Sequence, residues 1–251
     1  MGNTTPMSWG AGCRRIGDRT TDETNAMPQQ KVEEFWRVRI DSNVWEQVLH
    51  LGLRQKFSHG EEIISAGERV ERLCYLHSGE VCMKRTSMEG SEKIIMHIAQ
   101  HSLFCEVPFF TDCPITSSFV CHQDATVYFF PRETVDAMVA EHPEIAKDII
   151  RTLSEKVSVL CNQSASLGLD SLEQRIVKFI LLQYNSLPLH SNEIISLGSL
   201  KMKDIAGILS VHRVTLYKAF KELESRGFIK MLSRNRLQII DIESLSAIAY
   251  E

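Results

Sequence analysis

Six side chains able to contact DNA stand close together in the C-terminal third of the chain. They are His212, Arg213, Val214, Thr215, Tyr217 and Lys218. Arginine can bond a guanine edge through two hydrogen bonds, valine can contact a thymine methyl, and threonine, tyrosine and lysine can hold phosphates. The group therefore predicts a DNA-reading surface. An ordinary amphipathic helix with a solvated basic face would carry similar residues, so the prediction depends on the elements around it.

The apolar spacing around this group predicts two short helices joined by a tight turn. The apolar faces comprise Ile205, Ile208 and Leu209 in 203–209, and Leu216, Ala219, Phe220 and Leu223 in 213–224. Ala206 is small enough for the two helices to cross closely, and 210–212 break the helical pattern. This is a helix-turn-helix arrangement, whose second helix enters the major groove of DNA.

A basic hairpin is expected directly after the second helix. Segments 228–232 and 237–240 have strand-like composition and flank a turn that contains Arg234 and Arg236. A hairpin in this place makes the arrangement winged, and its tip could contact phosphate. Any soluble hairpin can also carry two arginines.

Charge and composition limit the function classes. Of the 28 Lys and Arg and 32 Asp and Glu residues, 11 and 8 lie in 171–251, which gives that part +3 and leaves −7 for the rest. A mildly basic C-terminal part fits local attraction to DNA phosphates. No apolar run approaches the roughly 18 residues of a membrane span, so we expect a cytoplasmic protein. No phosphate loop, nucleophile elbow or metal-ligand spacing is recognisable, so we expect neither an enzyme nor a cofactor.

The N-terminal half is expected to be mostly β-structure. Residues 1–36 form a polar, flexible extension, and 43–51 form a helix that Asn43 and Glu46 cap. Residues 37–131 then form a β-barrel effector-binding domain. Its short strands are expected at 62–65, 74–77, 81–85, 93–98, 117–121 and 126–130, with Gly60, Gly67, Gly79 and Gly90 in turns.

A long helix is expected to connect the two halves. It opens at Pro143, continues to about residue 166, and belongs to a region of 132–168 that ends in a hinge near Gly168. An apolar stripe follows it: Ile145, Ile149, Leu153, Val157 and Leu160. The last four could pair with a twin helix in a homodimer, or the stripe could pack within one chain. Residues 169–251 form the DNA-binding domain, and its first helix is capped by Asp170 and Glu173.

In this order the segments resemble the CRP/FNR superfamily of transcription regulators. The resemblance covers about 44–242 and rests on 57–67, 75–81 and 200–229. It implies an α+β protein with an N-terminal cyclic-nucleotide-binding-type β-barrel (jelly roll), a long dimerisation helix and a C-terminal winged helix-turn-helix. It also implies a homodimer that binds palindromic double-stranded DNA, responds to a small effector and works with RNA polymerase.

Departures from the nucleotide-binding members indicate a different effector. In those members the segment matching 103–118 holds the ribose and phosphate of cyclic AMP. Glu106 stands at the ribose-binding carboxylate, but Thr116, followed by Ser117, occupies the position of the phosphate-binding arginine, and Cys105 replaces a glycine. A phosphate buried without a cation costs several kcal/mol. We therefore expect an effector other than cyclic AMP.

The seven cysteines leave several alternatives open. The oxygen-sensing members use several N-terminal cysteines for an iron–sulfur cluster, whereas this chain has only Cys13 there. The haem-binding members carry a Cys and a His two residues apart; Cys105 matches the first, but Val107 replaces the second. Haem ligation through Cys105 or His101, a thiol–disulfide switch, and buried reduced thiols remain alternatives.

Aromatic residues and one lysine suggest what the effector is. Phe104, Phe109, Phe110 and Phe119 could line an apolar pocket, and Lys156 on the long helix could bind an anion, which suits an aromatic acid or phenolate. Segments 211–215 and 156–157 resemble the branch that senses halogenated phenolic compounds. Lys156 could alternatively be a solvated helix residue. As a whole, the protein could alternatively respond to redox state or to a haem-bound gas, or it could bind DNA constitutively.

Overall fold

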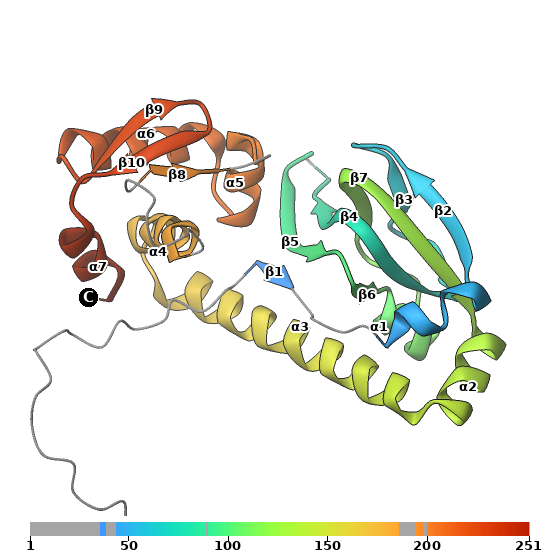
Figure 1. Cartoon of the computed structure of the whole chain (residues 1–251). Coiled ribbons are helices and arrows are strands. Elements are labelled where there is room, and N and C mark those ends of the chain that lie inside the picture. Colours follow the sequence, from blue (N-terminus) through green and yellow to red (C-terminus); the bar gives the residue numbers. More distant parts are fainter. Residues whose placement is uncertain (1–35, 39–43, 89, 186–193, 198–199, 251) are drawn as a thin grey trace, which may run out of the picture. The chain divides into compact units, whose positions relative to one another are not determined.

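The computed structural model describes residues 36–38, 44–88, 90–185, 194–197 and 200–250 (Figure 1). The expected extension of 1–36 lies outside the described residues except for Trp36, and so do Cys13 and Asn43. No helix within the described ranges has the length and apolarity that a bilayer crossing demands.

The N-terminal part contains one seven-stranded sheet, which we call the sheet domain. Its strands are β1 (Arg37–Val38), β2 (Leu53–Phe57), β3 (Glu62–Ile64), β4 (Arg72–Thr86), β5 (Glu92–Ala99), β6 (Ser102–Phe104) and β7 (Ser118–Pro131). The main path runs β1-β5-β4-β7-β2, with β3 on β7 and β6 on β4. The α+β class is confirmed, and the sheet is of the jelly-roll type. Its described strands follow an open path and do not close into a full barrel.

Two pairs of expected strands are each a single long strand. Segments 74–77 and 81–85 belong to β4, and 117–121 and 126–130 fall almost entirely within β7, which pairs with β4 from Arg72↔Pro131 to Lys84↔Ser118. Gly79 does not make the expected turn. It has φ 91°, lies among register shifts of β4, and a Cβ there would stand 2.3 Å from the carbonyl oxygen of Asp124. The glycine therefore permits a close strand approach inside the sheet.

The expected helix at 43–51 is instead two 3₁₀ turns, η1 (Trp45–Gln47) and η2 (Leu49–Leu51). The two turns insert Trp45 into the core. The indole is fully buried, stacks on Tyr75 at a centroid distance of 5.8 Å, and donates from Nε1 to Asp148 Oδ2 at 2.9 Å. Tertiary burial of one large ring therefore overrides the local helical pattern.

Helix α1 (Glu106–Thr111) lies between β6 and β7, and two helices follow β7: α2 (Arg132–Glu141) and α3 (Pro143–Leu169). Figure 1 shows α3 as one continuous helix. It passes through Gly168, so the chain breaks at Asp170 and not at the expected hinge residue. The expected Asp170–Glu173 capping box is also wrong. Ser171 and Gln174 exchange the capping hydrogen bonds, while Asp170 pairs with Lys178 at 2.7 Å.

The C-terminal part contains α4 (Leu172–Asn185), β8 (Ile194–Ser196), α5 (Met202–Ile208), α6 (Arg213–Ser225), β9 (Ile229–Ser233), β10 (Arg236–Ile239) and α7 (Ile242–Tyr250). The two expected strands are present, and β8 adds a third on β10. The core includes fully buried Phe179, Ile205 and Leu216, which come from α4, α5 and α6. Burial of these side chains fixes the angle between α5 and α6.

Candidate DNA-binding surface and effector site

The turn between α5 and α6 brings the start of α6 to the surface. Ser210 has φ 54°, and the Val211 amide donates to the Ala206 carbonyl at 3.0 Å, which closes the turn. His212 is the N-cap of α6, and its Nδ1 accepts from the Val214 amide at 3.4 Å. From α4, Arg175 donates to the Leu209 carbonyl at 2.9 Å and holds the end of α5. The helix-turn-helix geometry is therefore fixed by contacts on both sides of the turn.

All six residues expected to contact DNA are exposed on this surface. The apolar face of α6 is buried through Leu216, Phe220 and Leu223, whereas His212, Arg213, Val214, Thr215, Tyr217 and Lys218 are exposed. Val214 is 52% and Tyr217 56% exposed, so both side chains are available for contact at this surface. Arg234 and Arg236 are exposed at the β9–β10 hairpin, where Arg236 pairs with Ser233.

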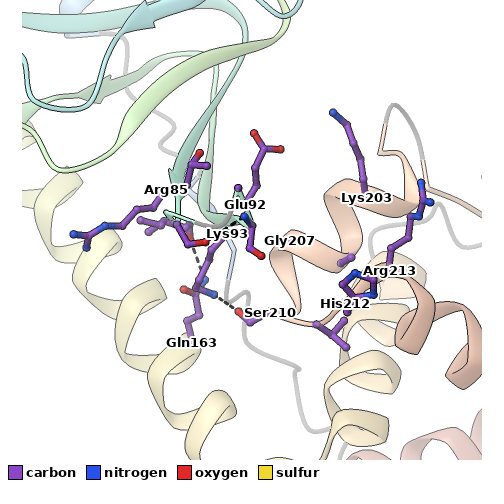
Figure 2. A pocket seen from close by; sticks show the side chains of 16 residues that line it. Arg85, Glu92, Lys93, Gln163, Lys203, Gly207, Ser210, His212 and Arg213 are labelled. Carbon is purple, nitrogen blue, oxygen red and sulfur yellow. Dashed lines mark hydrogen bonds between the residues drawn. The ribbon is translucent and has the colours of Figure 1, made fainter.

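His212 and Arg213 also line a hollow that the turn between β4 and β5 borders (Figure 2). Lys93 donates to the Ser210 hydroxyl across it, and Gln163 of α3 donates to the Ile95 carbonyl at 2.9 Å. Burial, and secondarily the charge of Arg175, lowers the pKa of Lys93. In this conformation the start of α6 therefore lies beside the sheet domain through direct contacts.

The sheet domain contains a buried ion pair between α1 and α3. Lys156 Nζ donates to both carboxylate oxygens of Glu106 at 2.7 Å and to the Leu103 carbonyl at 2.9 Å. The side chains are 11% and 2% exposed. Cys105 immediately precedes α1 with φ 69°, a left-handed conformation that turns the chain into the helix. The expectation that Lys156 is a solvated helix residue is therefore wrong.

Buried hydroxyls without a hydrogen-bond partner among the described residues occur in the same domain. They are the side-chain oxygens of Ser102, Ser117 and Thr152. Thr152 lies four positions before Lys156, so both face the same side of α3. Buried hydroxyls normally find a partner, and unpaired ones point to a bound ligand or water.

Two domain models match the chain. A cyclic nucleotide-binding domain matches residues 54–142, and a Crp-like helix-turn-helix domain matches 174–248. The chain belongs to the CRP/FNR family of transcription regulators. It is 25% identical over 191 residues to the CRP-like cAMP-activated global transcriptional regulator of Mycobacterium tuberculosis, which covers 76% of this chain and 85% of the relative.

Solved structures of CRP/FNR regulators have the same fold. A CooA mutant from Carboxydothermus hydrogenoformans matches with a TM-score of 0.71 at 16% identity, over 82% of this chain and 94% of that one. CprK complexed with OCPA matches with a TM-score of 0.68 at 17% identity, over 86% and 99%. At this level of identity the likeness concerns the fold alone.

The structure separates the residues that were expected to bind an effector. Phe104 and Phe119 lie in one core cluster, with their tilted rings 5.2 Å apart between centroids. Phe109 lies in another cluster, where Arg132 covers its ring at 4.5 Å, and Phe110 is 47% exposed. Thr116 is exposed, whereas the next residue, Ser117, is buried. Of the expected set, Glu106 and Lys156 are in direct contact, Phe104, Phe109 and Ser117 are also buried, and Thr116 is exposed.

Two groups of cysteines differ in exposure. Burial is the main cause that raises the pKa of Cys82 to about 12 and of Cys121 to about 11, so both thiols resist oxidation at neutral pH. Cys105 is buried beside Cys74, and its pKa is also raised, first by burial. Cys113 and Cys161 are exposed. Any thiol chemistry of the described residues therefore begins at the exposed pair.

Three residues whose proximity the sequence did not indicate lie close together at the surface of the sheet domain. Glu46, His77 and His101 bring one oxygen and two nitrogens within 4.8 Å of one another. His77 and His101 lie 31 and 55 positions from Glu46, so no local spacing could reveal the cluster. A second cluster combines Glu80, His97 and His122.

Proposed function

We propose that this CRP/FNR regulator binds a palindromic DNA site as a homodimer and that a small effector other than cyclic AMP controls it. The observation that carries the DNA-binding part is the exposed start of α6. Arg213, Val214 and Thr215 are exposed above a buried apolar face, as a recognition helix requires. Lys218 and the hairpin residues Arg234 and Arg236 provide positive charge for phosphates on either side.

The exposed face of α3 supports the dimer. Ile149, which was expected to belong to the dimer stripe, is buried against the sheet domain. Its exposed neighbour Ile150 takes its place in the stripe. Ile150, Val157 and Leu160 are 63%, 58% and 41% exposed. Together with partly buried Leu153 and exposed Leu167 they alternate by threes and fours, interrupted at Ser164, as in a coiled-coil seam. A second copy of α3 would cover this seam and place two recognition helices on one duplex.

The ion pair of Lys156 and Glu106 supports an effector that differs from cyclic AMP. Glu106 already neutralises the one lysine expected to bind an anion, and Thr116 offers no charge. An aromatic or halogenated phenolic acid would have to displace Glu106 from Lys156, whereas its ring could contact the Phe104–Phe119 pair. A displacement of this kind would move α1 relative to α3 and so link effector binding to the dimer helix.

The same contacts indicate how the start of α6 becomes available. In the conformation described here, Lys93 donates a hydrogen bond to the Ser210 hydroxyl. Gly207 of α5 packs closely against Ile94, because a Cβ added at Gly207 would stand only 3.2 Å from the Ile94 side chain. Effector binding would favour a second conformation in which these contacts are released and both recognition helices fit successive major-groove half-sites. RNA polymerase would be the further partner at a promoter.

Selection of binding sites from random DNA tests the DNA-binding proposal. The expected result is an inverted repeat whose half-site centres lie about 10 base pairs or a multiple of that apart. Affinity that is equal for all sequences would contradict it. A melting-temperature screen with cyclic AMP, cyclic GMP, haem and aryl carboxylic and phenolic acids tests the effector, because a ligand of the native state raises the melting temperature. A shift with cyclic AMP would overturn the argument from Thr116.

A constitutive DNA-binding protein is the second candidate, because the Lys156–Glu106 pair neutralises both charges without a ligand. DNA affinity unchanged by every compound of the panel would favour it. A regulator controlled by oxidation of Cys113 or Cys161 is a further alternative. Repeating the DNA titration with Cys113→Ser and Cys161→Ser variants in oxidising and reducing buffer distinguishes it from an effector-controlled or constitutive protein.

A further inference from the structure

We propose that Glu46, His77 and His101 form a binding site for a divalent transition-metal ion of the zinc class. The inference goes beyond DNA binding and does not depend on the identity of the effector. Its ligands come from three separate elements: Glu46 from η1, His77 from β4, and His101 from the turn between β5 and β6.

The distances between the donor atoms match those around a bound ion. Glu46 Oε1 lies 3.1 Å from His77 Nδ1 and 3.3 Å from His101 Nδ1. Zinc binds histidine nitrogen and carboxylate oxygen at about 2.0–2.2 Å, so neighbouring ligands of a tetrahedral site lie about 3.3 Å apart. An ion can therefore enter with small side-chain shifts. The two imidazole rings stand at 82° to each other, with Nδ1 of each directed to the same oxygen.

A hydrogen bond from Tyr75 positions the carboxylate of Glu46. Tyr75 donates to Glu46 Oε1 at 3.0 Å. Tyr75 therefore orients the carboxylate and is not itself a ligand, as hydrogen-bonded partners of metal ligands commonly do.

The backbone at His101 is an independent sign of a positioned side chain. Its φ of 62° is a conformation that residues other than glycine adopt infrequently, although histidine, asparagine and aspartate do so more often than most. The Glu46, His77 and His101 side chains are each about one third exposed, at 31%, 35% and 35%. An ion can therefore reach the site, and water can complete its coordination.

The second cluster is a weaker candidate because it already contains a cation. Arg37 donates to Glu80 Oε1 at 3.0 Å, and His97 Nδ1 lies 3.2 Å from the same oxygen. A metal ion there would stand beside a guanidinium. Within the described ranges the Glu46 carboxylate contacts Tyr75, His77 and His101, and none of these is a lysine or an arginine. Electrostatics therefore favours the Glu46 site.

A bound ion would connect the N-terminal segment to the sheet domain and to α3. Glu46 follows Trp45, whose indole is buried against Tyr75 and bonded to Asp148 of α3. Cross-linking Glu46 to β4 and to the β5–β6 turn would hold this ring in place. The metal is therefore expected to raise the melting temperature of the native protein.

The test titrates tag-free, chelator-treated full-length protein with zinc by calorimetry and with cobalt by visible absorption. We expect one ion per chain, with cobalt bands of a nitrogen and oxygen site and no thiolate charge-transfer band. His77→Gln, His101→Asn and Glu46→Gln should each weaken binding more than about 100-fold, and Tyr75→Phe about 10-fold to 100-fold. Asparagine at 101 keeps the left-handed backbone accessible, so that variant separates ligand loss from misfolding.

His142→Gln is the matched control, because His142 also pairs with a glutamate, Glu144 at 3.2 Å, in a different part of the chain. It should bind zinc like the wild type. Absence of stoichiometric zinc binding in the wild type would overturn the proposal. So would binding that survives His101→Asn in a folded protein, or that is lost only in His97→Gln or in cysteine variants.

Discussion

Lys156 Nζ lies 2.7 Å from each carboxylate oxygen of Glu106, and both side chains are almost fully buried. Taking two charges out of water is unfavourable, and the pair is stable only while both partners are present. Because Glu106 begins α1 and Lys156 lies in the middle of α3, the pair joins α1 to the helix that carries the proposed dimer seam. We therefore expect a ligand that acts on both helices to change this ion pair.

Removal of one partner should destabilise the protein more than removal of both. Lys156→Met or Glu106→Leu leaves one buried charge and should lower the free energy of unfolding by about 3–5 kcal/mol, whereas the double variant should be close to the wild type. Urea unfolding at one fixed protein concentration measures all four proteins. Single variants as stable as the wild type would show that the pair is not held in solution.

Substitutions in α6 should distinguish a residue that recognises a base from a residue that binds phosphate. Arg213→Ala should weaken specific binding by about 1–3 kcal/mol and relax the selected sequence at one base pair, whereas Lys218→Ala should weaken binding to all sequences and reduce the salt slope by about 1. Lys221→Ala, where the lysine pairs with Glu224 on the same helix, is the control. Competition titrations against single-base variants of the selected site separate these effects. A uniform loss for Arg213→Ala would reassign that residue to phosphate contact.

Val214 provides a separate test of base recognition. The nucleotide-sensing members resembled by this chain have a glutamate at this position. Val214→Glu should change the preferred base at one position of each half-site, because a carboxylate accepts from cytosine whereas valine contacts a thymine methyl. Repeating the random-site selection measures the change. An unaltered consensus would place Val214 outside the interface.

The dimer seam should be sensitive to charge at Val157. This side chain is 58% exposed, so Val157→Glu should leave the fold of one chain intact while it repels its twin across the seam. Light scattering after size exclusion should report half the wild-type mass, and affinity for the two half-sites together should fall. Ser158→Glu, an exposed neighbour off the seam, is the control. A Val157→Glu protein that remains dimeric would exclude this face.

Local patterns predicted the elements that depend on short-range periodicity. The helix-turn-helix and the exposure of Arg213 and Lys218 follow from spacings of three and four residues, which one helix face enforces. The contacts between distant segments could not be predicted in this way. Lys156 and Glu106 are 50 positions apart, and their pairing depends on how α3 packs against α1. Trp45 shows the same limit, because burial of its ring replaced an expected helix with 3₁₀ turns.

Acid should reveal the contribution of Glu80. Burial would raise its pKa, but the hydrogen bond with His97 and the charge of Arg37 outweigh it and lower the pKa from 4.5 to about 2. Because the folded-state pKa is depressed, the stabilisation is complete above the unfolded-state pKa and is lost as pH falls from 4.5 toward 2. The difference in unfolding free energy between wild type and Glu80→Gln should therefore stay constant above about pH 5 and shrink below it. Urea unfolding from pH 7 to pH 3 measures it, with exposed Glu155→Gln as the control. A pH-independent difference would mean that Glu80 acts through shape and not through charge.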